Sequence, residues 1–469
     1  MFKRGKLGKI ILYVSIEKGK IMKSVDKTKL FEEQSVPSAV TALCVPTIIA
    51  SLVTVLYNLA DTYFVGKLND PVQTAAVTLA ASVMLVFYAV NNLFGIGASS
   101  LMARSLGAKD YKTLKQASAF GFWGAVAGAL LISICVAVFQ NPLLHLIGAD
   151  GATIEETRTY IRWTVMFGAL PGILNVVMGH LVRSEGATFH AGIGTMSGCI
   201  LNIILDPIFI HGFHMGAEGA ALATFISNCV ALLYFMGYLV LKGKSTVVNI
   251  NPLSLKGING YVIKQVLIVG VPAAIQNLLN VLGTTIFNNL ASVYGAAALA
   301  AMGICQRIAQ IPMFVAMGGS QGVMPLVSYS YGAKKKERMR ETIYFSRKLM
   351  VIFLFSIAAC MFLFPRTAVG LFMKEPKTLE YGTKLLRGFS IAVPFLGLDF
   401  LGVGVYQAIG KGQYALGFAI ARKLILEIPL MWILDMVYPL YGLSFSQAIA
   451  EFVLAVASTI LIGKIVKEE

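Results

Sequence analysis

Long apolar segments recur along this chain from residue 36 to the C-terminus, and short polar segments separate them. Each apolar segment holds at least about 18 residues, close to the length that an α-helix needs to cross the hydrocarbon core of a bilayer. The pattern predicts an all-α polytopic membrane protein. Its twelve predicted transmembrane helices span residues 38–66, 74–103, 116–139, 157–181, 187–210, 216–241, 265–293, 296–328, 342–364, 384–408, 412–437 and 441–463.

Lysine and arginine residues fall mainly in alternate loops of this arrangement, as they do on the cytoplasmic side of membrane proteins. The basic loops follow the second, sixth and eighth predicted helices, and the opposite loops are poor in basic residues apart from Arg366, Lys374 and Lys377. We therefore predict a multi-pass protein of the cytoplasmic (inner) membrane of a prokaryote. Its basic N-terminal tail (1–35) and its C-terminal tail (464–469) are both predicted to be cytoplasmic. Met22 offers a second start, which would make residues 1–21 an upstream extension.

Short motifs from the first half of the chain return in the second half at a nearly constant distance. Five motifs repeat with offsets of 222 to 226 residues: Gly107-Ala108-Lys109 as Gly332-Ala333-Lys334, Val45-Pro46 as Val271-Pro272, Pro171 as Pro394, Gly186 as Gly410, and Pro207 as Pro429. Each repeat contains an even number of predicted helices, six, so both repeats enter the membrane from the same side and are parallel. We predict an N-lobe of helices 1 to 6 (36–241), a cytoplasmic linker (242–264) and a C-lobe of helices 7 to 12 (265–463).

The composition excludes several functional classes. Hydrophobic residues make up 57% of the chain and charged residues only 13%, whereas about 25% of the residues in a soluble domain are charged. The mean hydropathy is +0.74. The net charge is +16, but the basic residues lie in loops where they fix the topology, so we predict no nucleic-acid partner. No Walker, GxSxG, HExxH or paired-cysteine motif occurs, so we predict neither an enzyme, nor ATP as the energy source, nor a cysteine metal site.

Four oxygen-bearing residues lie within predicted helices of the N-lobe. Asp61 is in the first helix, Asn202 and Asp206 are about one turn apart in the fifth, and Thr224 is in the sixth. A carboxylate in the bilayer core is expensive, so each one is a candidate functional residue. Such oxygens bind a hard cation or share a proton, as ion coupling requires. The structural alternative is that Asp61 caps a helix end and that Asn202 and Asp206 only form interhelical hydrogen bonds.

The C-lobe does not repeat this set of residues. The counterparts of the two N-lobe acids fall near Asn288 and Glu427. Asp399 and Glu427 are isolated acids of the tenth and eleventh predicted helices, and Arg422 and Lys423 are their candidate partners. We favour a structural ion pair for Glu427, and we leave both a structural and a functional role open for Asp399.

The sequence resembles the multidrug and toxic compound extrusion (MATE) family of secondary transporters, in the branch of Mep-type and DinF-like bacterial multidrug exporters. The resemblance covers about residues 36–463 and rests on Pro46 and LYNLADTYFVGKL, LGAKDYKTLKQ, LNIILDPIFI and GAEGAALATFIS in the first half and on VGVP and YGAKKKE in the second. It implies twelve helices in a V-shaped arrangement around a central cavity. It also implies a cation or proton coupling site formed by Asp61, Asn202, Asp206 and Thr224, with Pro46 where the first helix bends.

The resemblance further implies the activity, which is the export of cationic or amphipathic organic compounds in exchange for protons or sodium. The partners would be these small molecules and the lipid bilayer, the protein would be a monomer, and it would need no cofactor or metal beyond the coupling ion, H⁺ or Na⁺. The candidates for the substrate cavity or a second acidic site are Tyr57, Asn58, Gln276, Asn280 and Asp399. Another branch of the family carries an acid early in the seventh helix, where this chain has Gln276, Asn277 and Asn280, which argues against a sodium site in the C-lobe.

A flippase for a lipid-linked saccharide is the alternative function, because related proteins of the same superfamily move such cargo. A polyanionic headgroup requires several basic residues within the membrane, and we place only Arg307, Arg422 and Lys423 there. A membrane enzyme or a receptor is a third class, but no catalytic constellation is visible, and a receptor gives no reason for internal repetition. The sequence therefore favours a cation-coupled secondary multidrug exporter, and it leaves the choice between protons and sodium open.

Overall fold

A computed structural model describes residues 27–68 and 70–468 of the chain, and residues 1–26 of the predicted N-terminal tail lie outside them. The described residues form helices and connecting turns, without a strand. A short helix, α2 (Lys27–Glu32), precedes the first membrane-length helix. The predicted all-α class is confirmed.

The first half of the chain forms the N-lobe, in which π-helical turns (η1, η2 and η3) interrupt several helices. Its elements are α3 (Val36–Gly66), α4 (Pro71–Asn91), η1 (Asn92–Ile96), α5 (Gly97–Gly107), α6 (Tyr111–Val138), α7 (Gln140–Leu146), α8 (Ile154–Ile161), η2 (Arg162–Phe167), α9 (Ala169–Ser184), α10 (Thr188–Pro207), η3 (Ile208–Gly212) and α11 (Gly216–Lys242).

Two short 3₁₀ turns, η4 (Gly243–Ser245) and η5 (Pro252–Leu255), lie in the segment between the lobes. The C-lobe then contains α12 (Gly260–Ser292), α13 (Ala296–Gly332), α14 (Lys336–Leu363), α15 (Pro365–Gly370), α16 (Pro376–Ala408), α17 (Gly412–Ile420), the π-helical turn η6 (Ala421–Glu427), α18 (Ile428–Val437) and α19 (Gly442–Glu468).

Every predicted span is helical in the structure, but two of them are unusual. Among the described residues, ten helices are long and apolar enough to cross a membrane, and the helix pair Ile154–Phe167 and Ala169–Ser184, bent by 47°, reaches that length and apolarity only together. The predicted span 412–437 is continuous from α17 through η6 to α18, yet it holds Arg422, Lys423 and Glu427 within a few residues. Three charges in one span are tolerated only if other helices supply partners.

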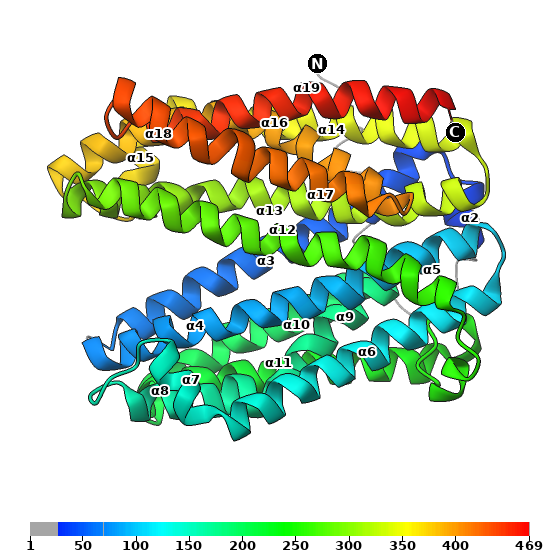
Figure 1. Ribbon diagram of the computed structural model, residues 1–469, viewed down its shortest axis with the longest axis horizontal. Coiled ribbons are helices and arrows are strands. Elements are labelled where there is room, and N and C mark those ends of the chain that lie inside the picture. The colour runs from blue at the N-terminus through cyan, green and yellow to red at the C-terminus, as the bar shows by residue number, and fades with distance from the viewer. Residues whose placement is uncertain (1–26, 69, 469) are drawn as a thin grey trace, which may run out of the picture.

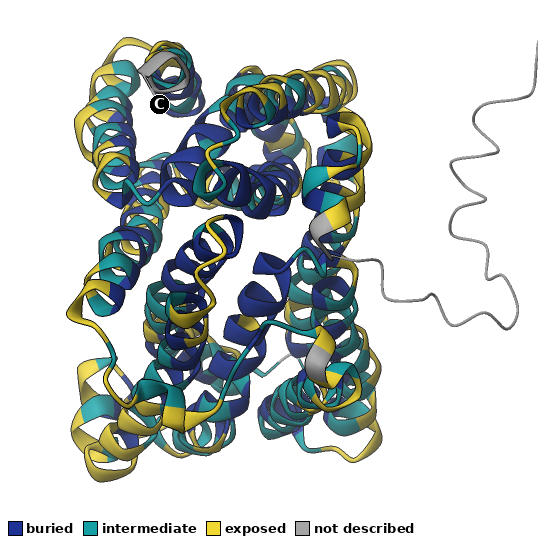
Figure 2. Cartoon of the chain, turned by 90° about the vertical axis from the view of Figure 1, so that its right-hand side faces the viewer, coloured by how far each residue is buried: buried dark blue, intermediate teal, exposed yellow. Residues whose placement is uncertain are grey.

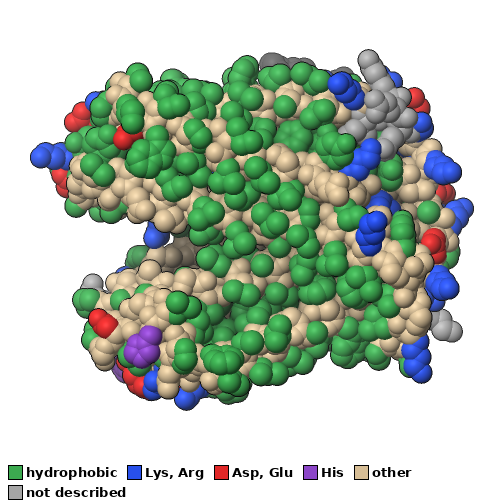
Figure 3. Space-filling view, in the orientation of Figure 1, with side chains coloured by type: hydrophobic (Ala, Val, Ile, Leu, Met, Phe, Trp, Pro, Cys, Tyr) green, Lys and Arg blue, Asp and Glu red, His purple; other side chains and the backbone are tan. Residues whose placement is uncertain are grey.

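The two lobes lie one above the other and meet along a limited set of helices (Figure 1). α3 of the N-lobe packs against α13 of the C-lobe, and α12 packs against η1 and α5. Viewed from one end, the buried residues gather inside the helix bundles and the exposed residues lie on the outside (Figure 2). Figure 3 shows a cleft between the lobes at one end, which we call the cleft end, whereas Lys and Arg side chains gather at the opposite, basic end.

The backbone preserves the internal repeat at its turns. Lys109 and Lys334, which end the repeated Gly-Ala-Lys motif, both adopt left-handed backbone angles, with φ of 58° and 57°. Gly186 and Gly410, the repeated glycines after α9 and α16, have φ of 84° and 81°. Residues other than glycine rarely adopt such backbone angles. Because the equivalent residues of the two lobes have nearly the same φ, each repeated motif builds the same turn in both lobes.

The lobes are in backbone contact at the basic end. A Cβ atom at Gly107 would collide with the carbonyl oxygen of Tyr329, and a Cβ atom at Gly332 would collide with that of Arg104. The two contacts are reciprocal, since each repeated glycine faces the helix end of the other lobe. The glycines of the repeated motif therefore allow α5 and α13 to close this end of the molecule.

Gly107→Ala is expected to weaken this closure, because the added methyl group has no space between the lobes. Cys44 is a suitable reporter, since it is buried on α3 and its thiol donates to Gly319 O of α13 at 3.5 Å. With the other cysteines replaced by serine, a polar maleimide should label Cys44 about tenfold faster in Gly107→Ala, equivalent to a closure weakened by about 1.4 kcal/mol. The control is Gly417→Ala, where a Cβ has no neighbour within 4 Å; equal labelling rates in all proteins would contradict the prediction.

Candidate functional site

α3 passes through Pro46 as one helix and is held there by α10. Proline has no N–H group, so the carbonyl of Ala42 lacks its usual helical donor. The hydroxyl of Thr188 in α10 donates to Ala42 O at 3.4 Å. Gly192 lets α10 approach further, because a Cβ there would lie 3.2 Å from Pro46 O. A second helix thus compensates for the proline and fixes α3 beside α10.

Asp206 lies at the end of α10, directly before Pro207 and the π-helical turn η3. Its side chain is fully buried, with 0% exposed. Among the described residues, no Lys or Arg forms an ion pair with it or with Asp61. π-helical turns are frequent at functional sites because they shift the register of the helix that follows.

Asn202 links Asp206 to Thr224 of α11. In the amide orientation that satisfies both neighbours, its nitrogen donates to Asp206 Oδ2 at 2.9 Å, and its oxygen accepts from the Thr224 hydroxyl at 3.2 Å and from the Thr224 N–H at 3.1 Å. Asn202 is buried as well. The expected one-turn spacing in α10 therefore produces a connected polar chain between two helices.

Asp61 of α3 faces the same cluster. Its Oδ1 atom is buried and accepts no hydrogen bond. It lies within electrostatic reach of Asp206 and of two phenols, Tyr57 on α3 and Tyr160 on α8. Tyr57 also lies beside Thr224. The structure thus gathers Tyr57, Asp61, Asn202, Asp206 and Thr224, which the sequence had named, and adds Tyr160.

This N-lobe cluster connects to the lobe interface through α3. The helix packs against α10 in its own lobe and against α13 in the other. Asp61 lies near the C-terminal end of α3, and Asp206 near that of α10, both toward the cleft end of the lobe (Figure 1). A change in the charge of the cluster therefore acts on a helix that also contacts the opposite lobe.

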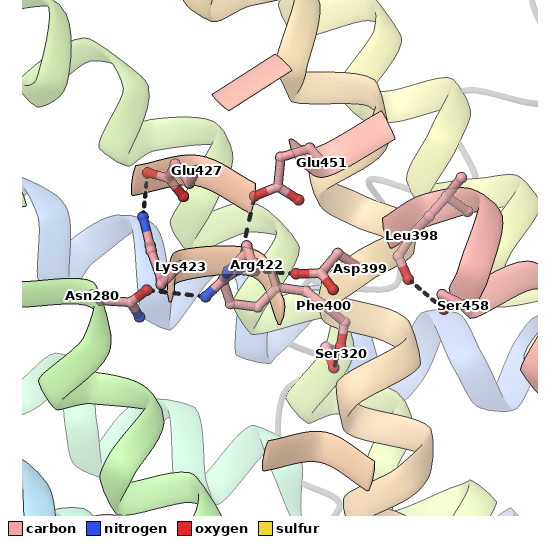
Figure 4. A network of polar contacts seen from close by, with 10 residues as sticks. All are labelled: Asn280, Ser320, Leu398, Asp399, Phe400, Arg422, Lys423, Glu427, Glu451 and Ser458. Atoms are coloured by element: carbon pink, nitrogen blue, oxygen red, sulfur yellow. Dashed lines mark hydrogen bonds and ion pairs between the residues drawn. The ribbon is translucent and has the colours of Figure 1, made fainter. Parts of the chain in front are cut away.

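The C-lobe contains a separate buried network (Figure 4). Arg422 Nη1 donates to Asp399 Oδ2 at 2.9 Å, and Arg422 Nη2 donates to Asn280 Oδ1 at 2.9 Å. Lys423 Nζ lies 2.6 Å from Glu427 Oε1. The ion pair favoured for Glu427 is thus confirmed, and Asp399, for which both roles were left open, pairs with Arg422. Asn280 joins the network.

Some predicted residues join neither group. Asn58 and Gln276 are half-buried on α3 and α12, and the structure gives their side chains no recorded hydrogen bond. The count of basic residues within the helices was also too low, because Arg104 and Arg183 lie within α5 and α9. Arg183 is buried and donates to Gln321 Oε1 of the C-lobe at 3.1 Å, so it connects the lobes.

Two residues of the polar clusters were not found from the sequence. Tyr160 is one aromatic residue among many in the apolar segments, so no local signal marks it. Glu451 of α19 is buried and lies 3.8 Å from Arg422 Nη1. The sequence did contain a signal for Glu451, because the cost of placing a glutamate in a membrane span makes it a candidate functional residue.

The chemistry of the N-lobe cluster suits one small cation or a proton. Two carboxylates, an amide, a hydroxyl and two phenols converge there, and oxygen ligands are typical of hard cations. Within the described residues, no three histidine, cysteine or acidic side chains are arranged to bind a metal ion. Any cation held here would therefore rely on uncharged oxygens as well as on Asp61 and Asp206.

Comparison with known proteins identifies the family. The MatE family model matches residues 46–208 and 272–433, once in each lobe. The multidrug export protein MepA of Staphylococcus aureus (strain NCTC 8325 / PS 47) is 33% identical over 434 residues, covering 92% of this chain and 94% of that protein. A crystal structure of MATE in the straight conformation has a TM-score of 0.89 at 24% identity, covering 95% of this chain and 99% of the other. An outward-facing multidrug resistance MATE family transporter of the MOP superfamily has a TM-score of 0.88, also at 24% identity, with the same coverage. The chain therefore belongs to the MatE family, the multidrug and toxic compound extrusion family that its motifs resemble.

Proposed function

We propose that this protein is a secondary active exporter that moves cationic or amphipathic organic compounds out of the cell in exchange for protons or sodium ions. Family membership and the multidrug export function of MepA support the substrate class. The coupling groups are Asp61 and Asp206, and Asn202 and Thr224 supply supporting oxygens.

One contrast between the lobes carries the proposal. The C-lobe acids Asp399 and Glu427 have basic partners at 2.9 and 2.6 Å, whereas no such partner is described for Asp61 or Asp206. Two buried carboxylates near one another repel, and each loses solvation energy in the membrane. A proton or a bound cation must compensate this charge, and a site that needs a mobile cation is what an ion-coupled transporter requires.

The orientation of the cleft matches the outward-open state in which an exporter releases its cargo. The basic end carries the loops that the positive-inside rule assigns to the cytoplasm, so the cleft end would face outward. In this conformation the backbone contacts at Gly107 and Gly332 close the cytoplasmic side. Ion binding would shift the equilibrium toward another state only if the two states bind the ion with different affinities. Movement of α3, which joins the cluster to α13, would supply that difference.

The ion that drives transport can be identified in reconstituted vesicles. We expect efflux of a fluorescent cation such as ethidium under one imposed gradient, protons alone or sodium alone, and no efflux above leak without a gradient. The measurement is dye accumulation with each gradient separately at equal membrane potential. Dye movement that is independent of both gradients would contradict the antiport mechanism.

Pro46→Ala is expected to loosen coupling rather than to abolish ion binding. Pro46 leaves Ala42 O free of its helical donor, and Thr188 compensates across the helix interface; alanine would restore the bond within α3 and favour an unbent helix. We expect fewer dye molecules exported per ion taken up, while the cluster still binds its ion. Ion uptake and dye efflux measured on the same vesicles test this, and Thr41→Ala on the same helix, whose hydroxyl only donates to Pro37 O at 2.7 Å, is the control. Normal stoichiometry in Pro46→Ala would show that the proline is a structural detail.

A further inference from the structure

The C-lobe network does not balance its charges. It contains three carboxylates, Asp399, Glu427 and Glu451, and two cations, Arg422 and Lys423. The carboxylates and Arg422 are at most 3% exposed. With every group ionised, the network would carry a net charge of −1 inside the membrane. An unpaired buried charge is strongly unfavourable, so one carboxyl group should hold a proton.

The geometry indicates which carboxyl group this is. Asp399 accepts from Arg422 at 2.9 Å, and Glu427 accepts from Lys423 at 2.6 Å. Glu451 Oε1 is 3.8 Å from Arg422 Nη1, which is too long for a hydrogen bond. Each of the three acids has one buried oxygen without a partner, but Asp399 and Glu427 accept a hydrogen bond on the other oxygen, which Glu451 does not. Glu451 is therefore the acid whose negative charge is least compensated.

The surroundings of Glu451 are well defined (Figure 4). Among the described groups, those that act on it electrostatically are Asp399 of α16 and Arg422, Lys423 and Glu427 of η6. Asp399 is fixed in place, because Ser320 of α13 donates to Phe400 O at 2.7 Å and Ser458 of α19 donates to Leu398 O at 3.3 Å. These bonds hold the α16 backbone on both sides of Asp399, which keeps its carboxylate beside Arg422 while Glu451 is protonated.

We propose that Glu451 is a proton-binding site in the C-lobe, distinct from the N-lobe cluster. The ligand is a proton and not a metal cation, because Arg422 and Lys423 already place two positive charges in the site. When the proton leaves, ionised Glu451 competes with Asp399 for Arg422. Arg422 also holds Asn280 of α12 at 2.9 Å. Protonation of Glu451 therefore stabilises the connection between η6 and α12.

Infrared spectroscopy tests the proposal directly, since a protonated carboxyl group has a C=O band well separated from those of carboxylates. The background is the purified full-length double variant Asp61→Asn/Asp206→Asn, which removes the N-lobe acids and makes the result independent of the ion that drives export. We expect one protonated-carboxyl band at neutral pH that shifts when glutamate, but not aspartate, is ¹³C-labelled. Glu451→Gln should remove this band, whereas Glu380→Gln, at an exposed glutamate outside the network, should retain it.

The proposal would be overturned by the absence of the band, by its persistence in Glu451→Gln, or by its shift with labelled aspartate. The labelling measurement needs no substitution in the network, so it remains decisive if Glu451→Gln fails to fold. A band that appears only when sodium is removed would instead assign a cation to the site and would also contradict a proton-binding Glu451. None of these outcomes bears on the N-lobe site, whose failure would appear as ion-independent efflux in the wild-type protein.

Discussion

Asp206→Asn is expected to abolish ion-coupled efflux while leaving the fold intact. Asn202 donates to Asp206 Oδ2, and the carbonyl oxygen of an asparagine can accept the same bond, so the polar chain to Thr224 survives. The amide cannot bind and release a proton, and it removes one of the two charges that would attract a cation. Ethidium efflux from reconstituted vesicles should fall to the leak of protein-free vesicles under either gradient.

The matched control is Asp110→Asn, which makes the same chemical change outside the membrane. Asp110 precedes α6 at the basic end and accepts from the Thr113 N–H at 3.0 Å, a helix cap that asparagine also forms. Hydrogen bonds with the Thr113 side chain and with the backbone at that helix terminus lower the pKa of Asp110, so it stays ionised at neutral pH and binds no coupling proton. Full efflux in the control with none in Asp206→Asn supports the assignment, and wild-type efflux rates in Asp206→Asn would refute it.

Arg422→Met is expected to give the largest loss of stability of any single change considered for the C-lobe. Arg422 interacts with Asp399 at 2.9 Å and with Glu451 at 3.8 Å and donates to Asn280. Its removal leaves acids of α16 and α19 facing each other without the cation between them. Breaking a buried ion pair on one side typically costs about 3 to 5 kcal/mol. Thermal or denaturant unfolding of the purified protein in detergent measures the loss of stability.

A double substitution separates the cost of an unpaired charge from the loss of a favourable contact. Arg422→Met with Asp399→Leu removes both partners, and apolar replacement of a buried pair is often neutral or stabilising. We therefore expect the double variant to be more stable than Arg422→Met alone. Lys384→Ala is the control, because its ion pair with Glu380 at 2.9 Å is exposed, and no measurable change is expected there. Equal stability of Arg422→Met and the wild-type protein would show that the network is not under electrostatic constraint.

The local pattern of the chain was sufficient for the helices and for much of the N-lobe cluster. Helix length and loop charge are read over consecutive residues, so the spans and the all-α class could be predicted from them. The neighbouring positions of Asn202 and Asp206 on one face of α10 follow from the helical period, which also needs no tertiary information. Arg422 and Lys423 could be named as candidate partners of Asp399 and Glu427 because few charged residues lie within the predicted spans.

The tertiary structure decided the contacts between distant helices. Tyr160 comes near Asp61 because α8 packs against α4 and α11. Glu451 of α19 approaches Arg422 of η6 because α19 packs against η6. The repeated Gly107 and Gly332 were visible in the sequence, but their reciprocal contact depends on how the two lobes are placed. The sequence alone determined which side chains are costly in a membrane, because that cost depends on residue type and burial in an apolar segment. Which of them compensate one another depends on the rotation and spacing of helices, and these are set by the shapes of all the packed side chains together.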